Sequence, residues 1–357
     1  MRLKSILALG LTGLALACAQ SADAARFEVT DLGVLPGGTD STAQGISDTG
    51  HVVGQSAGYP YVWRPGSGMQ KVEVLAPDVD YAGPDINDAD LLAVTGPHPD
   101  EDAFGFLWHG FLWASGNAID LGAVGEAPCL EGCDVDPNDQ SFANGINNFG
   151  TVVGASTVEN ASGPTSMAPT IWPGGGNPVR LPGSGGGRAR EIADNGRIVG
   201  TRGTHAMLWE DSGSQPTDLG LLPGSTGDQS DAYDLNEAGT VVGASETANG
   251  VTRAFMWTPG AGMQPIATPN TLSGFSSANA IGPDGTIVGS TYNGTKTVGF
   301  IREAGQPITD LNTLIPEGTG WDLGSARDIN NKGQIVGNGI LNGESRAYLL
   351  TPTQPLK

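Results

Sequence analysis

The sequence predicts an all-β protein, a seven-bladed β-propeller made of four-stranded antiparallel blades. Three observations support this prediction. A hairpin-like motif of twelve residues recurs seven times, and an aromatic segment and an Asp-Leu-Gly type of segment each recur seven times between its copies. Four short strands in each repeat of about 40 to 50 residues are typical of propeller blades. Because no copy resembles a polar cap, a closed ring is favoured over an open solenoid.

The twelve-residue motif has the pattern of two strands joined by a tight turn. In the copy AQGISDTGHVVG, an alanine and an isoleucine precede a turn that ends in Gly50, and β-branched residues follow. β-Branched residues favour strands, and a turn glycine supplies the positive φ that such hairpins need. Since a lone hairpin is unstable in water, the copies must pack on one another. The copies span residues 43–54, 83–94, 143–154, 189–200, 232–243, 278–289 and 326–337. The copy at 83–94 is degenerate, with Asp90 and Val94 in place of its glycines.

Two further segments complete each repeat, and Gly- and Pro-rich turns join them. The aromatic segments are Tyr61–Trp63, Phe111–Trp113, Thr170–Trp172, Met207–Trp209, Phe255–Trp257, Gly299–Ile301 and Ala347–Leu350. The Asp-Leu-Gly segments and their relatives are Asp31–Gly33, Glu73–Leu75, Asp120–Gly122, Val179–Leu181, Asp218–Gly220, Pro265–Ala267 and Asp310–Asn312. We expect the tryptophans of the aromatic segments to pack between neighbouring blades as core residues.

The order of the segments predicts how the ring closes. If the Asp-Leu-Gly strand is the outermost of its blade, Phe27–Leu32 completes the blade whose other strands come from Ala326–Leu350. Pairing the N- and C-terminal strands in this way hides sheet edges that would invite aggregation. The alternative places four consecutive strands between Phe27 and Trp63 in one blade.

Residues 1–24 have the features of a signal peptide: a basic start, an apolar core and a small-x-small cleavage site at residues 22–24. We therefore expect an exported protein, secreted or periplasmic, in which residues 25–357 form a single propeller domain. The alternative is a lipobox that ends at Cys18 and anchors the protein to the outer membrane through lipid. No later segment is long and apolar enough to predict a transmembrane span.

The chain is strongly acidic, with a formal net charge of −21 at pH 7. Such a surface repels nucleic acid and anionic membranes, which leaves metal cations, neutral glycans or basic proteins as partners. The alternative is that the acidity serves solubility alone. We expect a monomer. In an exported protein, Cys129 and Cys133 are predicted to form a disulfide that holds one insertion in place.

Three stretches near the start of the chain carry a family resemblance: VTDLGVLPGG (29–38), STAQGI (41–46) and VVG (52–54). Together they resemble the bacterial HAF-repeat family of extracellular proteins. The family's His-Ala-Phe signature before Leu-Trp is matched in part by HAMLW (205–209) and RAFMW (253–257). The resemblance covers nearly all of residues 25–357. It implies an exported repeat protein and supplies no catalytic residue.

Two insertions interrupt the rhythm, near residues 95–110 and 125–140, and irregular loops on a rigid scaffold are where function tends to lie. The second insertion is most simply an exposed acidic loop, and a calcium site is the alternative, because oxygen ligands alternate along it although the loop departs from the EF-hand pattern at Asp139 and Gly145. Its candidate ligands are Asp134, Asp136, Asn138 and Asp139. The first insertion supplies candidates for a ligand, metal or acid-base site, namely His98, Asp100, Asp102 and His109.

A set of serines stands two positions before the motif alanine: Ser41, Ser141, Ser230 and Ser276. We expect their hydroxyls to bond nearby backbone groups in Asx- or Ser-turns. The alternative is a ring of loops that lines a ligand site. The polar residues of the hairpin turns are predicted to be turn formers: Asp48, Asn148, Asp194, Glu237 and Asp284.

No Gly-x-Ser-x-Gly, His-Glu-x-x-His or phosphate-loop motif is present. We therefore expect a non-enzymatic binding or adhesion scaffold for a cell-surface or matrix glycan or protein, with Ca²⁺ as its candidate cofactor. The alternatives are an extracellular propeller enzyme, such as a polysaccharide lyase or glycoside hydrolase, and a structural surface or matrix component. An enzyme should bring histidines and carboxylates together in the central funnel, whereas a binding module should expose aromatic side chains or a glycine-walled groove.

Overall fold

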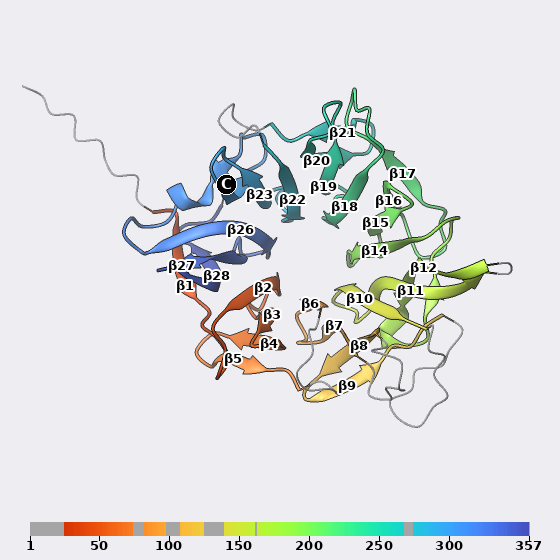
Figure 1. Ribbon diagram of the computed structural model, residues 1–357, viewed down its shortest axis with the longest axis horizontal. Helices are drawn as coiled ribbons and strands as arrows, with labels where there is room; N and C mark the ends of the chain where they lie inside the picture. The colour runs from red at the N-terminus through yellow and green to blue at the C-terminus, as the bar shows by residue number, and fades with distance from the viewer. Residues whose placement is uncertain are drawn as a thin grey trace, which may run out of the picture.

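The computed structural model describes residues 25–73, 82–97, 108–124, 139–160, 163–267 and 274–356. These residues form seven four-stranded antiparallel sheets, arranged in a ring around a central axis (Figure 1). The predicted seven-bladed β-propeller is confirmed.

Six blades take their four strands from consecutive stretches of chain, innermost strand first. The first blade holds β2 (Ser41–Ile46), β3 (Val52–Ser56), β4 (Tyr59–Arg64) and β5 (Gly68–Lys71). The second holds β6 (Ala82–Ile86), β7 (Leu92–Pro97), β8 (Trp108–Ala114) and β9 (Asn117–Asp120). The third holds β10 (Ser141–Ile146), β11 (Val152–Asn160), β12 (Gly163–Trp172) and β13 (Val179–Arg180).

The fourth blade holds β14 (Gly187–Ile192), β15 (Ile198–Arg202), β16 (His205–Trp209) and β17 (Thr217–Gly220). The fifth holds β18 (Ser230–Leu235), β19 (Val241–Glu246), β20 (Thr252–Thr258) and β21 (Gly262–Pro265). The sixth holds β22 (Ser276–Ile281), β23 (Ile287–Tyr292), β24 (Thr297–Arg302) and β25 (Thr309–Asp310). Two short 3-10 helices, η1 (Pro173–Gly175) and η2 (Leu311–Thr313), follow β12 and β25.

The seventh blade joins the two ends of the chain. It holds β26 (Trp321–Ile329), β27 (Ile335–Leu341), β28 (Glu344–Pro352) and, as its outermost strand, β1 (Phe27–Asp31). The strands β1 and β28 pair antiparallel, from Phe27 opposite Pro352 to Asp31 opposite Tyr348. Figure 1 shows β1 beside the other strands of this blade. The predicted closure is therefore confirmed, and the alternative that groups β1 with the first blade is wrong.

The outermost strands of the first and fifth blades lie earlier in the sequence than predicted. Strand β5 ends at Lys71 and β21 at Pro265, whereas the expected segments were residues 73–75 and 265–267. The reason is a tight hairpin at each place, in which Gly68 and Gly262 adopt positive φ and pair directly with the end of the preceding strand.

Apolar clusters between neighbouring blades hold the ring together. Trp172 of the third blade is fully buried against Ala93 and Leu121 of the second, and Trp209 of the fourth packs against Val153 of the third in the same way. The tryptophans at residues 63, 113 and 257 are half-buried against the corresponding clusters. The predicted packing of tryptophans between blades is confirmed.

A β-bulge in each innermost strand explains why the motif ends in glycine. In β2 the pairing register shifts between Ala43 and Gly45, so Gln44 is an extra residue. The bulge brings the carbonyl oxygen of Thr42 so close to Gly54 that a Cβ there would lie 1.8 Å from it. The equivalent glycines of five other blades would meet a carbonyl at 1.8 to 2.1 Å. In the second blade the bulge is longer, and Val94 occupies the glycine position.

Candidate functional site

The innermost strands of all seven blades surround a hollow of about 420 Å³, here called the central cavity. The bulged residue of each innermost strand lines it, because bulges re-aim side chains that strict alternation would point elsewhere. These residues are Gln44, Asn144, Arg190, Tyr233, Asn279 and Arg327, with Pro84 in the second blade.

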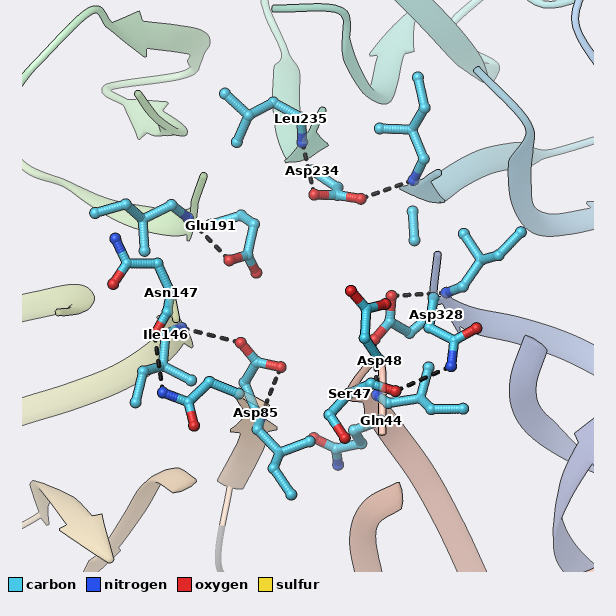
Figure 2. Close-up of a pocket in the computed structure, with 18 of the residues that line it drawn as sticks. Gln44, Ser47, Asp48, Asp85, Ile146, Asn147, Glu191, Asp234, Leu235 and Asp328 are labelled. Carbon is cyan, nitrogen blue, oxygen red and sulfur yellow. Dashed lines mark hydrogen bonds between the residues drawn. The ribbon is translucent and has the colours of Figure 1, made fainter. Parts of the chain in front are cut away.

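The residue after the bulge forms a second layer, here called the carboxylate ring. Four blades contribute an acid at this position, namely Asp85, Glu191, Asp234 and Asp328. Figure 2 shows these four side chains around one common hollow. The other three blades contribute a small residue, namely Gly45, Gly145 and Ala280.

Three of the acids bridge two blades. Asp85 accepts the backbone N–H of Ile86 in its own strand at 2.8 Å and that of Ile146 in the third blade at 2.9 Å. Asp234 bridges the N–H groups of residues 235 and 281 at 2.6 and 2.7 Å. Asp328 bridges those of residues 329 and 46 at 2.7 and 2.8 Å.

The fourth acid differs from the other three. Glu191 accepts only the N–H of Ile192, at 2.9 Å. Four carboxylates thus satisfy all seven N–H groups of this layer, as buried backbone donors require. The second carboxylate oxygen of Glu191 accepts no hydrogen bond from any described residue.

The small residues of the layer make room for the acids. A Cβ at Gly145 would lie 2.9 and 3.0 Å from the two carboxylate oxygens of Glu191. A Cβ at Gly45 would lie 2.8 Å from an oxygen of Asp85. Glycine is therefore needed beside these carboxylates because of a close approach, not because of a turn.

Burial makes the carboxylate ring hard to ionise. Burial, followed by the charge of Asp328, raises the pKa of Asp85 to about 7 and that of Asp234 to about 8. Burial also raises the pKa of Asp328 to about 6 and that of Glu191 well above its usual value, the latter with help from Asp85 and Asp234. The backbone N–H bonds oppose these shifts because they stabilise the charged form. Near neutral pH the layer therefore carries fewer than four negative charges.

Polar turn residues tie neighbouring blades together at one mouth of the cavity. The backbone N–H of Asn331 donates to the side chain of Asp48 at 2.7 Å, and that of Asp48 to the side chain of Asp88 at 2.7 Å. In the same way, the N–H of Asp88 donates to Asn148 at 3.0 Å. The N–H of Asn148 donates to Asp194 and that of Asp194 to Glu237, both at 2.8 Å. In the sixth blade this position is Pro283, which has neither an N–H nor an acceptor side chain. Asp284 instead accepts the N–H of Thr286 within its own turn.

Four polar groups in the cavity remain uncommitted. The Gln44 amide, the Arg327 guanidinium, the Tyr233 hydroxyl and one Glu191 oxygen make no hydrogen bond within the part of the chain that the structure describes. By contrast, Asn144 and Asn279 each donate to a carbonyl of the next blade at 2.7 Å. Arg190 pairs with Asp231 at 2.7 Å. The uncommitted groups come from four different blades.

An exposed aromatic side chain follows two cavity-lining residues in the chain. Phe149 comes directly after Asn147 and Asn148 in the turn between β10 and β11, but it is not itself among the residues that line the cavity. Its side chain is 73% exposed, more than that of any other large hydrophobic residue among those described. The turn therefore adds an exposed aromatic ring to this end of the propeller.

The serines singled out in the sequence are buried ties between blades. Ser41 accepts the N–H of Ala347 and Ser230 that of Ala206, both at 3.0 Å. Ser141 and Ser276 accept the N–H groups of residues 110 and 254, also at 3.0 Å. Ser41 also donates to the carbonyl of Gly33 in the loop after β1, and Ser230 donates to that of Gly220, the last residue of β17. The four serines thus lie apart from one another, each engaged within the fold.

His109 lies in β8, buried together with Asp120 of β9, and its Nδ1 is 2.9 Å from a carboxylate oxygen of that residue. His205 and Asp218 repeat the arrangement at 2.8 Å in the fourth blade. In each pair the histidine stands two residues before the aromatic segment, and the aspartate is the first residue of the Asp-Leu-Gly segment that follows. His98, Asp100 and Asp102 lie outside the described residues.

The candidate calcium loop and the predicted disulfide fall mostly outside the described residues. Of the four candidate calcium ligands only Asp139 is described; Asp134, Asp136 and Asn138 are not, and neither are Cys129, Cys133 and Cys18. Among the described residues no group of three or more His, Cys, Asp or Glu side chains is placed to hold a metal ion. Calcium binding and the disulfide stay predictions.

Comparisons with solved structures find other propellers. The extracellular domain of BT4673 from B. thetaiotaomicron, named a one component system, matches 90% of this chain with a TM-score of 0.54 and 10% identity. This chain spans 39% of that one. The RRP9 WD40 repeats match 91% of this chain (97% of their own) with a TM-score of 0.54 and 11% identity. U3-55K matches 92% of this chain (98% of its own) with a TM-score of 0.53 and 11% identity.

These matches establish the fold alone. No family model matches the chain, and no curated protein matches it significantly. Within the described ranges, no helix has the length and apolar character needed to cross a membrane.

Proposed function

We propose that this protein is an exported, non-enzymatic binding protein whose central cavity takes a segment of a neutral glycan. The convergence of four uncommitted polar groups, from Gln44, Glu191, Tyr233 and Arg327, carries the proposal. Amide, hydroxyl, carboxylate and guanidinium groups all form hydrogen bonds with sugar hydroxyls. Phe149 lies in a turn that follows two cavity-lining residues, and its exposed ring is suited to stacking on a sugar unit that extends beyond the cavity.

Size and charge support this class of ligand. A hollow of about 420 Å³ has the dimensions of a small-molecule site and is too small for a folded protein partner. The net charge of −21 opposes an acidic polysaccharide and favours a neutral one. Export rests on the signal-peptide pattern of residues 1–24, and membership of the HAF-repeat family belongs to the same proposal. Mass spectrometry of the mature N-terminus distinguishes a free protein from one lipidated at Cys18.

The carboxylate ring favours binding over hydrolysis. A glycoside hydrolase commonly uses two carboxyl groups, one as acid and one as base or nucleophile. Three of the four acids here hold two backbone N–H groups each, which leaves only Glu191 with a free oxygen. No histidine is among the described residues that line the cavity.

A glycan-array screen of the mature protein, followed by turnover assays on each hit, tests the proposal. Gln44→Ala and Arg327→Ala should each weaken binding of a hit about tenfold, the equivalent of about 1.4 kcal/mol. Arg180→Ala is the matched control because Arg180 is exposed on the outermost strand β13, away from the cavity. Binding that survives both cavity variants would refute the site. Cleavage of a hit would instead support the lyase or hydrolase alternative.

A further inference from the structure

A second hollow, of about 400 Å³, lies between the fourth, fifth and sixth blades and is here called the side groove. Its walls include the turn between β15 and β16, the start of β18 and the residues just before β22. These segments lie at the end of the blades opposite the hairpin turns that follow the innermost strands. The side groove and the central cavity share Tyr233 as a common wall.

The acids of the side groove are already engaged. Asp231 forms an ion pair with Arg190 at 2.7 Å and accepts a hydrogen bond from the hydroxyl of Thr201. Glu246 accepts the backbone N–H of Asp228 at 3.3 Å. No lysine or arginine is among the described lining residues, so the groove lacks the donors that a phosphate or sulfate requires.

Neutral hydrogen-bonding groups remain available. The amide of Gln229 and the hydroxyls of Thr204 and Thr252 belong to residues that line the groove, and none makes a side-chain hydrogen bond within the described chain. An amide and two hydroxyls offer both donors and acceptors without a net charge. That combination suits the alternating donors and acceptors of a polyhydroxylated ligand.

An aromatic ring stands at the edge of the same groove. Phe275 is 46% exposed, and its carbonyl accepts the backbone N–H of Tyr292 at 2.9 Å, which fixes its position. The ring of Tyr292 covers Gly274, where a Cβ would lie only 2.7 Å from a ring carbon. An exposed aromatic face held next to neutral polar groups is suited to the apolar C–H face of a sugar ring.

We propose that the side groove is a second saccharide site, which takes one neutral pyranose unit stacked on Phe275 and hydrogen-bonded by Gln229 and Thr204. The inference rests on the proposed function for its class of ligand but uses different residues on the opposite face of the ring. Two such sites would let one propeller hold two glycan chains at once, one on each face.

Isothermal titration tests the proposal with a panel of neutral tetrasaccharides of β-1,4-glucose, α-1,4-glucose, β-1,4-mannose and β-1,4-N-acetylglucosamine. At least one member should bind with two sites per chain. Phe275→Ala should weaken one site about tenfold or more, and Gln229→Ala should weaken the same site. Gln44→Ala should weaken only the other. Ile340→Ala, a change of an exposed side chain on β27 outside both hollows, should alter neither.

The possible outcomes separate the two sites. A single site that is lost in Phe275→Ala and kept in Gln44→Ala supports the side groove and refutes the central cavity. A single site with the reverse behaviour refutes the side groove and leaves the cavity standing. Absence of binding to every tetrasaccharide overturns both. Because Phe275 and Gln229 are exposed, thermal melts of these variants should match the unaltered protein.

Discussion

Asp234→Asn should destabilise the ring, whereas Glu191→Gln should not, although each change removes one acid from the same layer. Asp234 accepts two backbone N–H groups, those of Leu235 and Ile281, and both residues are buried. An asparagine has one carbonyl oxygen to accept one of them, and its NH₂ group faces the other donor. Glu191 accepts one N–H only, which the carbonyl oxygen of glutamine can replace in full.

The expected magnitude follows from the number of donors left without an acceptor. A buried N–H without a partner costs about 1 to 3 kcal/mol, and Asp234→Asn leaves one such group. Both changes relieve repulsion among the acids, so the difference between the two variants isolates the second N–H. At about 2 °C per kcal/mol for a domain of this size, Asp234→Asn should lower the Tm by roughly 2 to 6 °C relative to Glu191→Gln.

Differential scanning calorimetry at pH 9 measures this difference under conditions where the native Asp234 carboxyl is ionised, since its pKa is about 8. Glu191→Gln should melt at or slightly above the temperature of the unaltered protein. Equal melting temperatures for the two variants, or a lower one for Glu191→Gln, would refute the reasoning that the acids act by bridging blades.

Three further predictions concern pH, the serine ties and the closure of the ring. Burial raises the pKa values of Asp85, Asp234 and Asp328. The folded protein therefore binds more protons than the unfolded chain between about pH 4 and pH 8. The contribution of these acids to the free energy of unfolding should fall as pH rises through that window. Guanidinium titrations should show a smaller fall for Asp234→Asn, and an equal fall would contradict the assignment. Ser230→Ala leaves the N–H of Ala206 without its acceptor and should cost about 1 to 3 kcal/mol in the same titration, whereas Ser212→Ala, at an exposed position, should cost nothing. A chain that begins at residue 34 lacks β1 and should lose cooperative unfolding, and a synthetic peptide of residues 25–33 should restore it; a truncated chain that melts like the full one would show that closure does not depend on β1.

The sequence was sufficient to predict the number of blades and the pairing of the chain ends. Both follow from local signals, since the two motif glycines mark six of the seven hairpins and the order of segments determines which strand is outermost. The tryptophans were equally predictable because they recur at one position of the repeat. These features depend on strand geometry that every copy shares.

The cavity was not predictable in the same way. Strict alternation would place Arg190 and Glu191 on opposite faces of β14, but the bulge directs both side chains to the cavity. The carboxylate ring was missed because its motif position holds an acid in four copies and a small residue in three. No single residue type therefore recurs there when the copies are compared. The signal was the restriction of this position to Asp, Glu, Gly or Ala, and it gains meaning only once neighbours around the closed ring are known.

The carboxylate ring has a consequence for how a ligand is oriented. Blades that contribute an acid to this layer and blades that contribute a small residue cannot alternate perfectly around a ring of seven. At least one pair of neighbouring blades must therefore be alike. In this protein the like pair is the fourth and fifth blades, where Glu191 and Asp234 are adjacent. At this seam two acids are neighbours, whereas at each of the other six boundaries an acid lies beside a small residue. The acids are therefore distributed unevenly around the axis, and a molecule that enters along it meets more carboxylate on one side than on the other.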